Sequence, residues 1–285
     1  MTPRSVFVGL VSHPGSQFCE SQGPKGLVAR LVDTLEAAGV RCSSQINTRN
    51  LFDEAGFLLT PVMARASVRA EIQLEGKWFR FLKGETRLRH FSRILSRYVR
   101  FALSWRKNSG TRELRRLLNI EYSHVDLYRT AIASGSDWSI ILEDDAFTPD
   151  QGELALGLKC LFEEEKPPKF VNLSESFPLG DLGISHLLTE SSQEKWIGAS
   201  TRVVYQAERP ATNTVCAIVF HTNFLAKILA DFDAQPTQPI VPIDWKLNDS
   251  LMRLWDRGEI GPNECWFVKP APIVQLSMVH DHAGD

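Results

Sequence analysis

The feature that most constrains the fold is a short apolar run that ends abruptly in three acids. Residues 138–142 read Trp-Ser-Ile-Ile-Leu and are followed by Glu143, Asp144 and Asp145. An unbroken run of this length is typical of a strand buried on both faces. Three adjacent carboxylates cannot be buried together uncompensated, because each raises the cost of ionising the next. The acids must therefore lie at the carboxyl edge of a sheet, where open α/β sheets bind their ligands.

The three acids form a candidate metal site. Hard cations such as Mg²⁺ and Mn²⁺ choose carboxylate oxygens, and Mg²⁺ usually joins one or two carboxylates to substrate phosphates. We predict Asp145 as the first ligand, with Glu143 or Asp144 assisting directly or through water. The alternative is a solvated acidic turn closed by Pro149, which is the commoner structure when such a strand end is taken alone.

The rest of the chain alternates predicted strands and helices. Strands are predicted at 5–12, 40–46, 170–173 and 212–220, and helices at 26–39, 87–106, 111–134, 151–165, 223–232 and 245–255. The alternation predicts an α/β fold, and the length of 285 residues fits one domain with an insertion as well as two domains. Ser12 and His13 follow the first strand and are expected at the ligand edge, and so are Ser174 and Glu175 after a later strand.

The segment from about 60 to 110 is basic and reads as an insertion. We predict a hairpin around Gly76 within it, and a loop at 176–200 further along. At 87–106 a helix carries apolar side chains on one face and arginines around that face. Such a helix suits contact with an anionic membrane or an acidic partner. Packing of the same face on the protein's own core is the alternative, and the pattern slightly favours it.

Composition excludes several classes of protein. The formal net charge of −2 argues against a general nucleic-acid binder, and no apolar window has the length of a membrane span. No Gly-x-Gly-x-x-Gly or P-loop sequence is present. The five cysteines are scattered without zinc-ligand spacing, which predicts reduced core thiols in a cytoplasmic protein. A peripheral position at the inner face of the membrane follows if the basic helix binds lipid.

Four separated segments resemble glycosyltransferase family 25, the lipopolysaccharide-type and collagen-type galactosyltransferases. The first carries Ser123 and His124 on a helix and then the string ILEDDA at 141–146. The others are TNTVCAIVFHTNFLAKIL at 212–229, PIDWKLNDSL at 242–251 and VKPAPIVQLS at 268–277. Their order and rough spacing agree with the family over about residues 110–280. The first strand departs from it, because SHPGSQ stands where the family has an Asn-Leu-x-x-Arg-x-x-Arg pattern.

The resemblance implies a GT-A-like fold, with a Rossmann-type mixed sheet in a single domain over 1–285. It implies a metal-dependent glycosyltransferase that uses Mn²⁺ or Mg²⁺ and a nucleotide sugar, with UDP as the expected nucleotide. A hexose, with galactose as the first candidate, would pass with inversion to a hydroxyl of a glycan or glycolipid. Asp244 matches the family's Pro-x-Asp and is predicted as the base that takes the proton of that hydroxyl. A helix N-cap is an equally supported role for Asp244, and Asp249 is the alternative base.

Other polar residues are predicted to line the site. Donor or acceptor contacts are expected from Ser12, His13, His124, Ser174, Glu175 and Gln275. A core role for His124 is the open alternative, and His280 is a further metal ligand unless the tail is simply polar and exposed. Two rival functions remain: a catalytically diverged sugar- or nucleotide-binding scaffold, and a metal-dependent phosphoesterase or nucleotidyltransferase.

Overall fold

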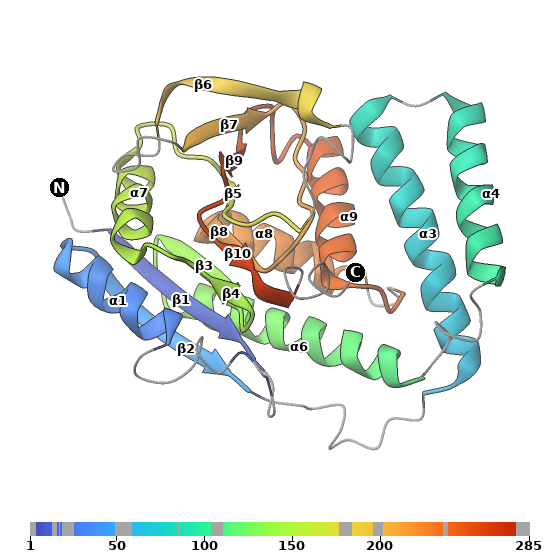
Figure 1. The fold of residues 1–285 in the computed structure, drawn as a ribbon, viewed down its shortest axis with the longest axis horizontal. Coiled ribbons are helices and arrows are strands. Elements are labelled where there is room, and N and C mark those ends of the chain that lie inside the picture. Colours follow the sequence, from blue (N-terminus) through green and yellow to red (C-terminus); the bar gives the residue numbers. More distant parts are fainter. Residues whose placement is uncertain are drawn as a thin grey trace.

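The apolar run before the acids forms strand β3 (Trp138–Glu143), the third strand of an eight-stranded mixed sheet with helices on both faces (Figure 1). The computed structural model describes residues 4–12, 16, 18, 26–48, 59–84, 86–103, 111–176, 184–195, 202–235 and 239–277. The α/β fold with a Rossmann-like mixed sheet, predicted from the alternation and the resemblance, is confirmed.

The strands follow the order β2-β1-β3-β8-β5-β9-β7-β6 across the sheet. Their bounds are β1 (Ser5–Val11), β2 (Arg41–Asn47), β5 (Phe170–Asn172), β6 (Leu188–Lys195), β7 (Val203–Ala207), β8 (Ala217–His221) and β9 (Cys265–Lys269). Strands β2, β1, β3, β5 and β9 run in one direction, whereas β8 and β7 run against them. A small second sheet pairs β4 (Ala146–Phe147) with β10 (Val274–Gln275).

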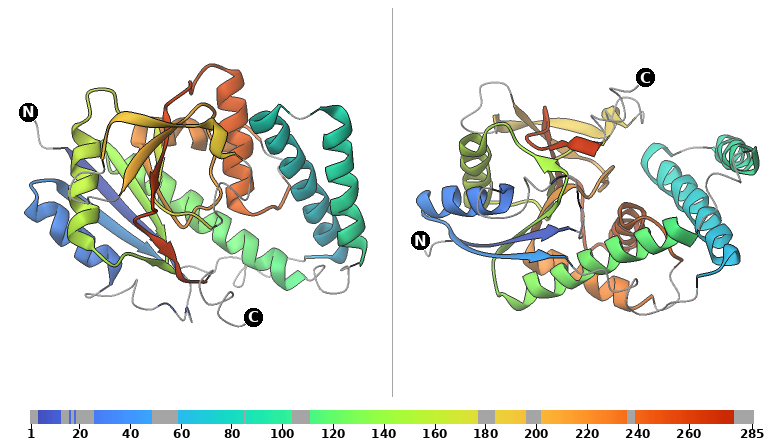
Figure 2. Two further views of the ribbon diagram at one scale, coloured as in Figure 1. Left: turned by 45° about the horizontal axis from the view of Figure 1, so that its top comes forward. Right: turned by 60° about the horizontal axis from the view of Figure 1, so that its bottom comes forward.

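Helices cover the two faces of the sheet. Their bounds are α1 (Leu27–Ala37), α3 (Pro61–Lys83), α4 (Arg87–Leu103), α6 (Thr111–Ala133), α7 (Gln151–Glu163), α8 (Thr222–Asp233) and α9 (Ile243–Asp256), with a 3₁₀ turn at Ser185–Leu187. Helices α1 and α7 lie on one face, and α6 and α8 lie on the other (Figure 2). Among these helices, none combines the length and apolar character that crossing a bilayer requires.

Alternation along the strands divides the apolar core into two layers. In β1, Val6, Val8 and Leu10 pack with α1 and α7, whereas Phe7 and Val11 point to the α6 side. Successive strand side chains point to opposite faces, so a strand covered on both sides is apolar at every position. This is why the sequence of β3 is apolar on both faces apart from buried Ser139, whose hydroxyl is hydrogen-bonded to that of Thr222.

The strand directions bring several polar segments to one edge. The carboxyl ends of β1, β2, β3 and β5 meet there, and antiparallel β8 starts at the same edge. Strand ends that are far apart in sequence therefore lie close together beside the acids that follow β3. This geometry confirms the expected position of those acids at the carboxyl edge of the sheet.

Two local predictions are wrong. Residues around Gly76 form no hairpin, because Gly76 is buried inside the continuous helix α3. That helix has strong end signals: the Thr60 side chain accepts from Met63 N at 3.3 Å, and Gly84 closes it in the left-handed region. The predicted loop at 176–200 contains β6, which pairs with β7 at the far edge of the sheet.

Helices α3 and α4 form an outer layer beside α9. Helix α3 packs on α9 and α6, and α4 packs on α3 at the periphery of the molecule (Figure 2). Trp78 of α3 meets Trp245 of α9 edge to face, with ring centroids 5.6 Å apart. The basic segment is therefore helical where the structure describes it, and α3 is attached to the helix that carries Asp244.

Candidate functional site

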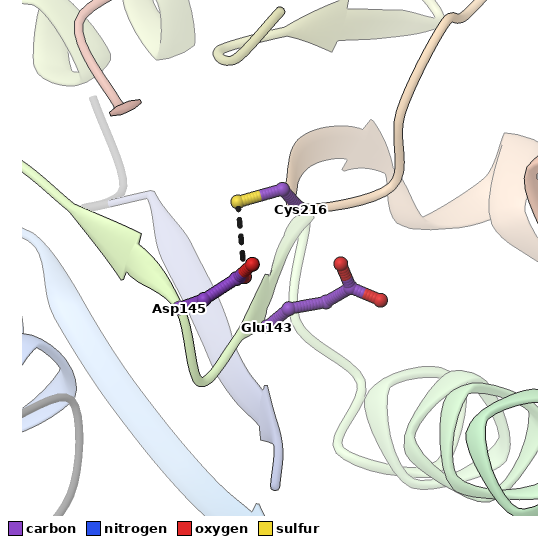
Figure 3. Close-up of side chains that lie close together, drawn as sticks. All are labelled: Glu143, Asp145 and Cys216. Atoms are coloured by element: carbon purple, nitrogen blue, oxygen red, sulfur yellow. Dashed lines mark hydrogen bonds between the residues drawn. The ribbon is translucent and has the colours of Figure 1, made fainter. Parts of the chain in front are cut away.

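Two carboxylates and one thiol gather at the carboxyl end of β3. Glu143, Asp145 and Cys216 each offer one ligand atom, and these three atoms lie within 4.8 Å of one another. Figure 3 shows the Asp145 carboxylate turned toward the Cys216 sulfur, with the Glu143 carboxylate beside them. Metal centres use these donor types, so the cluster is a possible cation site.

Asp145 is buried and already engaged within the protein. Its Oδ2 accepts from the Ser277 hydroxyl at 2.5 Å, and its backbone oxygen accepts from Leu276 N at 2.9 Å. Its Oδ1 lies 3.6 Å from Cys216 Sγ. These contacts tie the C-terminal segment to the acidic turn, because β10 pairs with β4 directly after Asp145. The simple solvated-turn alternative is therefore wrong for Asp145, which is only 7% exposed.

Cys216 is the site residue that sequence reasoning missed. It was interpreted as a small core thiol, and it is fully buried and free of any disulfide. Burial first, and then the charges of Asp145 and Glu143, raise the pKa of its thiol. Its place beside the acids follows from the register of antiparallel β8 on β3, where Leu142 pairs with Ala217. Nothing in the local sequence around Cys216 indicates that register.

Helix α6 fixes the orientation of Glu143. His124 is fully buried, and its Nε2 lies 3.2 Å from Glu143 Oε1. An ionised carboxylate only accepts, so Nε2 carries the proton in this contact. His124 also meets the ring of Tyr128 edge to face, one turn along the helix. Both interpretations of His124 therefore hold, because the side chain is in the core and also touches a site carboxylate.

Asp244 lies in the first turn of α9, half-buried, and Pro242 occupies the N-cap position. The N-cap role considered for Asp244 is therefore wrong. Its Oδ1 accepts from Trp245 N at 2.9 Å. Burial raises the pKa of Asp244 to about 7; the Trp245 hydrogen bond opposes this shift, and the charges of Glu143 and Glu71 add to it.

One face of α6 connects the two acids. Glu121 forms an ion pair with Lys246, two residues after Asp244, and His124 contacts Glu143 one turn further along α6. Residues three apart on a helix lie on the same face, so Glu121 and His124 both point from α6 toward the same region. The base candidate on α9 and the acidic end of β3 are therefore positioned by a single helix.

Several other predicted residues converge on the same edge. The Gln275 side-chain oxygen accepts from Ser176 at 2.7 Å and from Thr214 at 3.1 Å. The buried Ser174 hydroxyl accepts from Ala217 N at 3.0 Å, directly after Cys216 in the chain. Gln275 and Ser174 therefore support the segment that presents Cys216.

The remaining candidates have four different outcomes. Ser12 is buried at the end of β1, and its N–H donates to Asn47 at the end of neighbouring β2. Glu175 forms an ion pair with Lys269 at 3.3 Å. Asp144 is half-buried in the turn between β3 and β4. His13 and His280 lie outside the residues that the structure describes.

Comparison with known proteins leaves the family open. No protein-family model matches this chain, and no curated protein matches its sequence.

Proposed function

We propose that this chain is a metal-dependent glycosyltransferase that moves a hexose from a nucleotide sugar, a UDP sugar in the first instance, to a hydroxyl of a glycan or glycolipid. One observation carries the proposal: α6 contacts the acidic end of β3 through His124 and the start of α9, which carries half-buried Asp244, through Glu121. A transferase of this kind needs a cation site for the diphosphate and a separate carboxylate base.

The resemblance to family 25 supports the proposal through position. Its four matching segments are spread over about 150 residues of sequence, yet they supply β3, β8, the start of α9 and β10. In the structure Glu143, Cys216 and Gln275 come from three of these segments and lie at one edge of the sheet. Segments that converge in space are expected to act together. We also propose that the mixed sheet is of the GT-A type.

The donor atoms fit a divalent cation. Glu143 and Asp145 supply hard oxygens, whereas the Cys216 thiol, whose pKa is raised, adds a sulfur ligand only where the cation displaces its proton. The two carboxylates suit a hard divalent cation such as Mn²⁺ or Mg²⁺. Binding at Asp145 would replace its contacts with Cys216 and Ser277, so the C-terminal segment is expected to respond to the cation. When bound, the cation neutralises charge on the diphosphate leaving group.

Asp244 has the properties of a general base. A carboxylate with a pKa of about 7 accepts a proton more readily than an ordinary surface aspartate at neutral pH. In the proposed reaction Asp244 takes the proton of the acceptor hydroxyl while that oxygen bonds to the anomeric carbon. The bond from this carbon to the diphosphate oxygen breaks, and its electron pair leaves with the diphosphate. A single displacement of this kind inverts the anomeric configuration.

Thermal melting with nucleotides tests the donor site. We expect UDP with Mn²⁺ to raise the melting temperature by about 5 °C or more, since ligand at a hundredfold excess over its dissociation constant stabilises by about 2.7 kcal/mol. The rise should require Mn²⁺ and disappear in Asp145→Asn, which removes a charge from the cluster with little change of size. Asp150→Asn is the matched control, because the exposed Asp150 caps α7 and asparagine caps equally well.

The outcome separates the rival functions. A metal-dependent UDP shift with release of hexose from a UDP-hexose would support the transferase. The same shift without any turnover would instead support a binding scaffold. Hydrolysis of phosphate esters without preference for a nucleoside diphosphate would support the phosphoesterase, and absence of every nucleotide shift would overturn the proposal.

A further inference from the structure

Helix α4 presents an apolar stripe to solvent. Four large side chains on one side of the helix are exposed, at 82%, 66%, 51% and 51% for Leu88, Phe91, Leu95 and Val99. Their spacing of three, four and four residues places them on one helical face. Exposed apolar groups that are contiguous in this way mark interaction surfaces. The core-packing interpretation of this helix is therefore wrong for Phe91 and Leu95.

The other side of α4 holds it on α3. Arg97 forms an ion pair with Glu75 at 2.6 Å, and the Arg93 guanidinium lies 3.9 Å from the centroid of the Phe79 ring. Ile94 and Tyr98, on the same side, are partly buried. The helix is thus seated on the protein by a polar and aromatic face, and its apolar stripe is left pointing outward. Figure 1 shows α4 at the outer edge of the molecule, with α3 between it and α9.

The charge around the stripe indicates what covers it. Residues 61–103 contain ten Lys and Arg against three Glu and no Asp, whereas the whole chain has 32 basic and 34 acidic residues. Helix α4 itself contains five arginines and no acid. Packing two copies through this stripe would bring arginine-rich helices together, which like-charge repulsion disfavours. A bilayer with anionic lipid has apolar acyl chains and negatively charged headgroups. Such a surface can contact the apolar stripe and the arginines of α4 at the same time.

We infer that α4 is a membrane-surface helix that lies in the headgroup region of a bilayer containing anionic lipid. Leu88, Phe91, Leu95 and Val99 enter the boundary between headgroups and acyl chains, and exposed Arg89 reaches lipid phosphates beside them. This orientation places the protein beside a membrane through a surface contact. It concerns the partner of α4 and is independent of the reaction at β3.

Vesicle flotation of the full chain tests the inference. We expect binding to vesicles of equal parts phosphatidylcholine and phosphatidylglycerol, little binding to pure phosphatidylcholine, and weakening by salt. The double variant Phe91→Ser, Leu95→Ser should lower the partition coefficient about tenfold or more, because two large side chains no longer leave water. Arg89→Glu should lower it about tenfold by reversing a charge at the surface.

Matched controls come from the opposite end of the molecule. Leu156→Ser removes an exposed leucine from α7, and Arg30→Glu reverses an exposed arginine on α1, so both should bind as the wild type does. Thermal melting of every variant checks that it is folded. Equal binding to neutral and anionic vesicles, no binding at all, or unchanged binding of the Phe91 and Leu95 variant would overturn the inference. A dimer that the same variant dissociates would assign the stripe to a second copy instead.

Discussion

Replacing Asp244 with asparagine is expected to slow sugar transfer by about 10²- to 10⁴-fold, the range typical for loss of a positioned acid or base. Asparagine keeps the size of the side chain and an oxygen that accepts from Trp245 N, but it cannot take a proton. The fall should appear in kcat, with little change in the dissociation constant for UDP. Activity of the wild type should rise with pH and level off above about pH 7, as Asp244 loses its proton.

The same substitution should raise stability, and the sign follows from the raised pKa. An aspartate in the unfolded chain loses its proton near pH 4, whereas folded Asp244 keeps its proton until about pH 7. The stability that this group contributes is therefore fully present below about pH 4 and is lost as pH rises through 7. Asparagine avoids that loss. Because Asp244 is partly exposed to water, we expect a gain of only about 1 to 2 kcal/mol at pH 8 and little gain at pH 4.

Urea unfolding at pH 8 and pH 4 measures the gain, and Asp249→Asn is the control. Asp249 lies on the same helix and forms an ion pair with Arg253, so its loss should not stabilise the protein. It should also leave transfer nearly intact if Asp244 is the base. Loss of transfer in Asp249→Asn together with normal transfer in Asp244→Asn would mean that Asp249, and not Asp244, is the base. Equal stability of wild type and Asp244→Asn at both pH values would contradict the raised pKa.

The sequence predicted the elements around the site better than the site itself. The apolar run before Glu143 depends on local chemistry, and the strand it predicts is confirmed. Cys216 and the buried state of Asp145 depend on the pairing of β8 with β3 and of β10 with β4. Strand register joins residues about 70 to 130 positions apart, and no local pattern encodes it.

The two wrong local predictions have physical causes. Gly76 and the aromatic residues after it suggested a hairpin, yet the end signals at Thr60 and Gly84 and the packing of Trp78 on α9 favour one helix. Tertiary packing often overrides weak local preference in this way. In β6 the polar sequence resembled a loop because the strand lies at the edge of the sheet, next to β7 alone. An edge strand lacks the apolar signature of a buried one.

Replacing Asp231 with asparagine is expected to cost about 2 to 3 kcal/mol of stability. Asp231 is 3% exposed, and its carboxylate accepts from Arg253 Nη2 at 2.6 Å and from Arg257 Nη1 at 2.9 Å. Removing one partner of a buried pair costs about 3 to 5 kcal/mol when the remaining charge stays buried. Both arginines are partly exposed to water here, so we expect less. Asp233→Asn is the control, because its pair with Arg129 is exposed and should be worth under about 1 kcal/mol.

The stability contribution of Asp231 depends on pH in the opposite direction to that of Asp244. Burial acts to raise the pKa of Asp231, but the hydrogen bonds from Arg253 and Arg257 outweigh it and hold the pKa below its usual value. The contribution of Asp231 is therefore present above about pH 4 and is lost as pH falls further. The difference between wild type and Asp231→Asn in urea should shrink in acid. A difference that stays constant down to pH 2 would contradict the lowered pKa.

The double variant Asp231→Asn, Asp244→Asn tests whether the two sites at opposite ends of α9 affect stability independently. Asp231 holds α9 near its C-terminal end through Arg253, whereas Asp244 lies in its first turn. Arg253 lies nine positions after Asp244 on this helix, about 14 Å along its axis at 1.5 Å per residue. Sites this far apart without shared partners usually add to within about 0.5 kcal/mol. We therefore expect the two effects at pH 8 to sum. A clear departure would mean that the ion pair between Asp231 and Arg253 helps to set the position of Asp244 at the other end of α9.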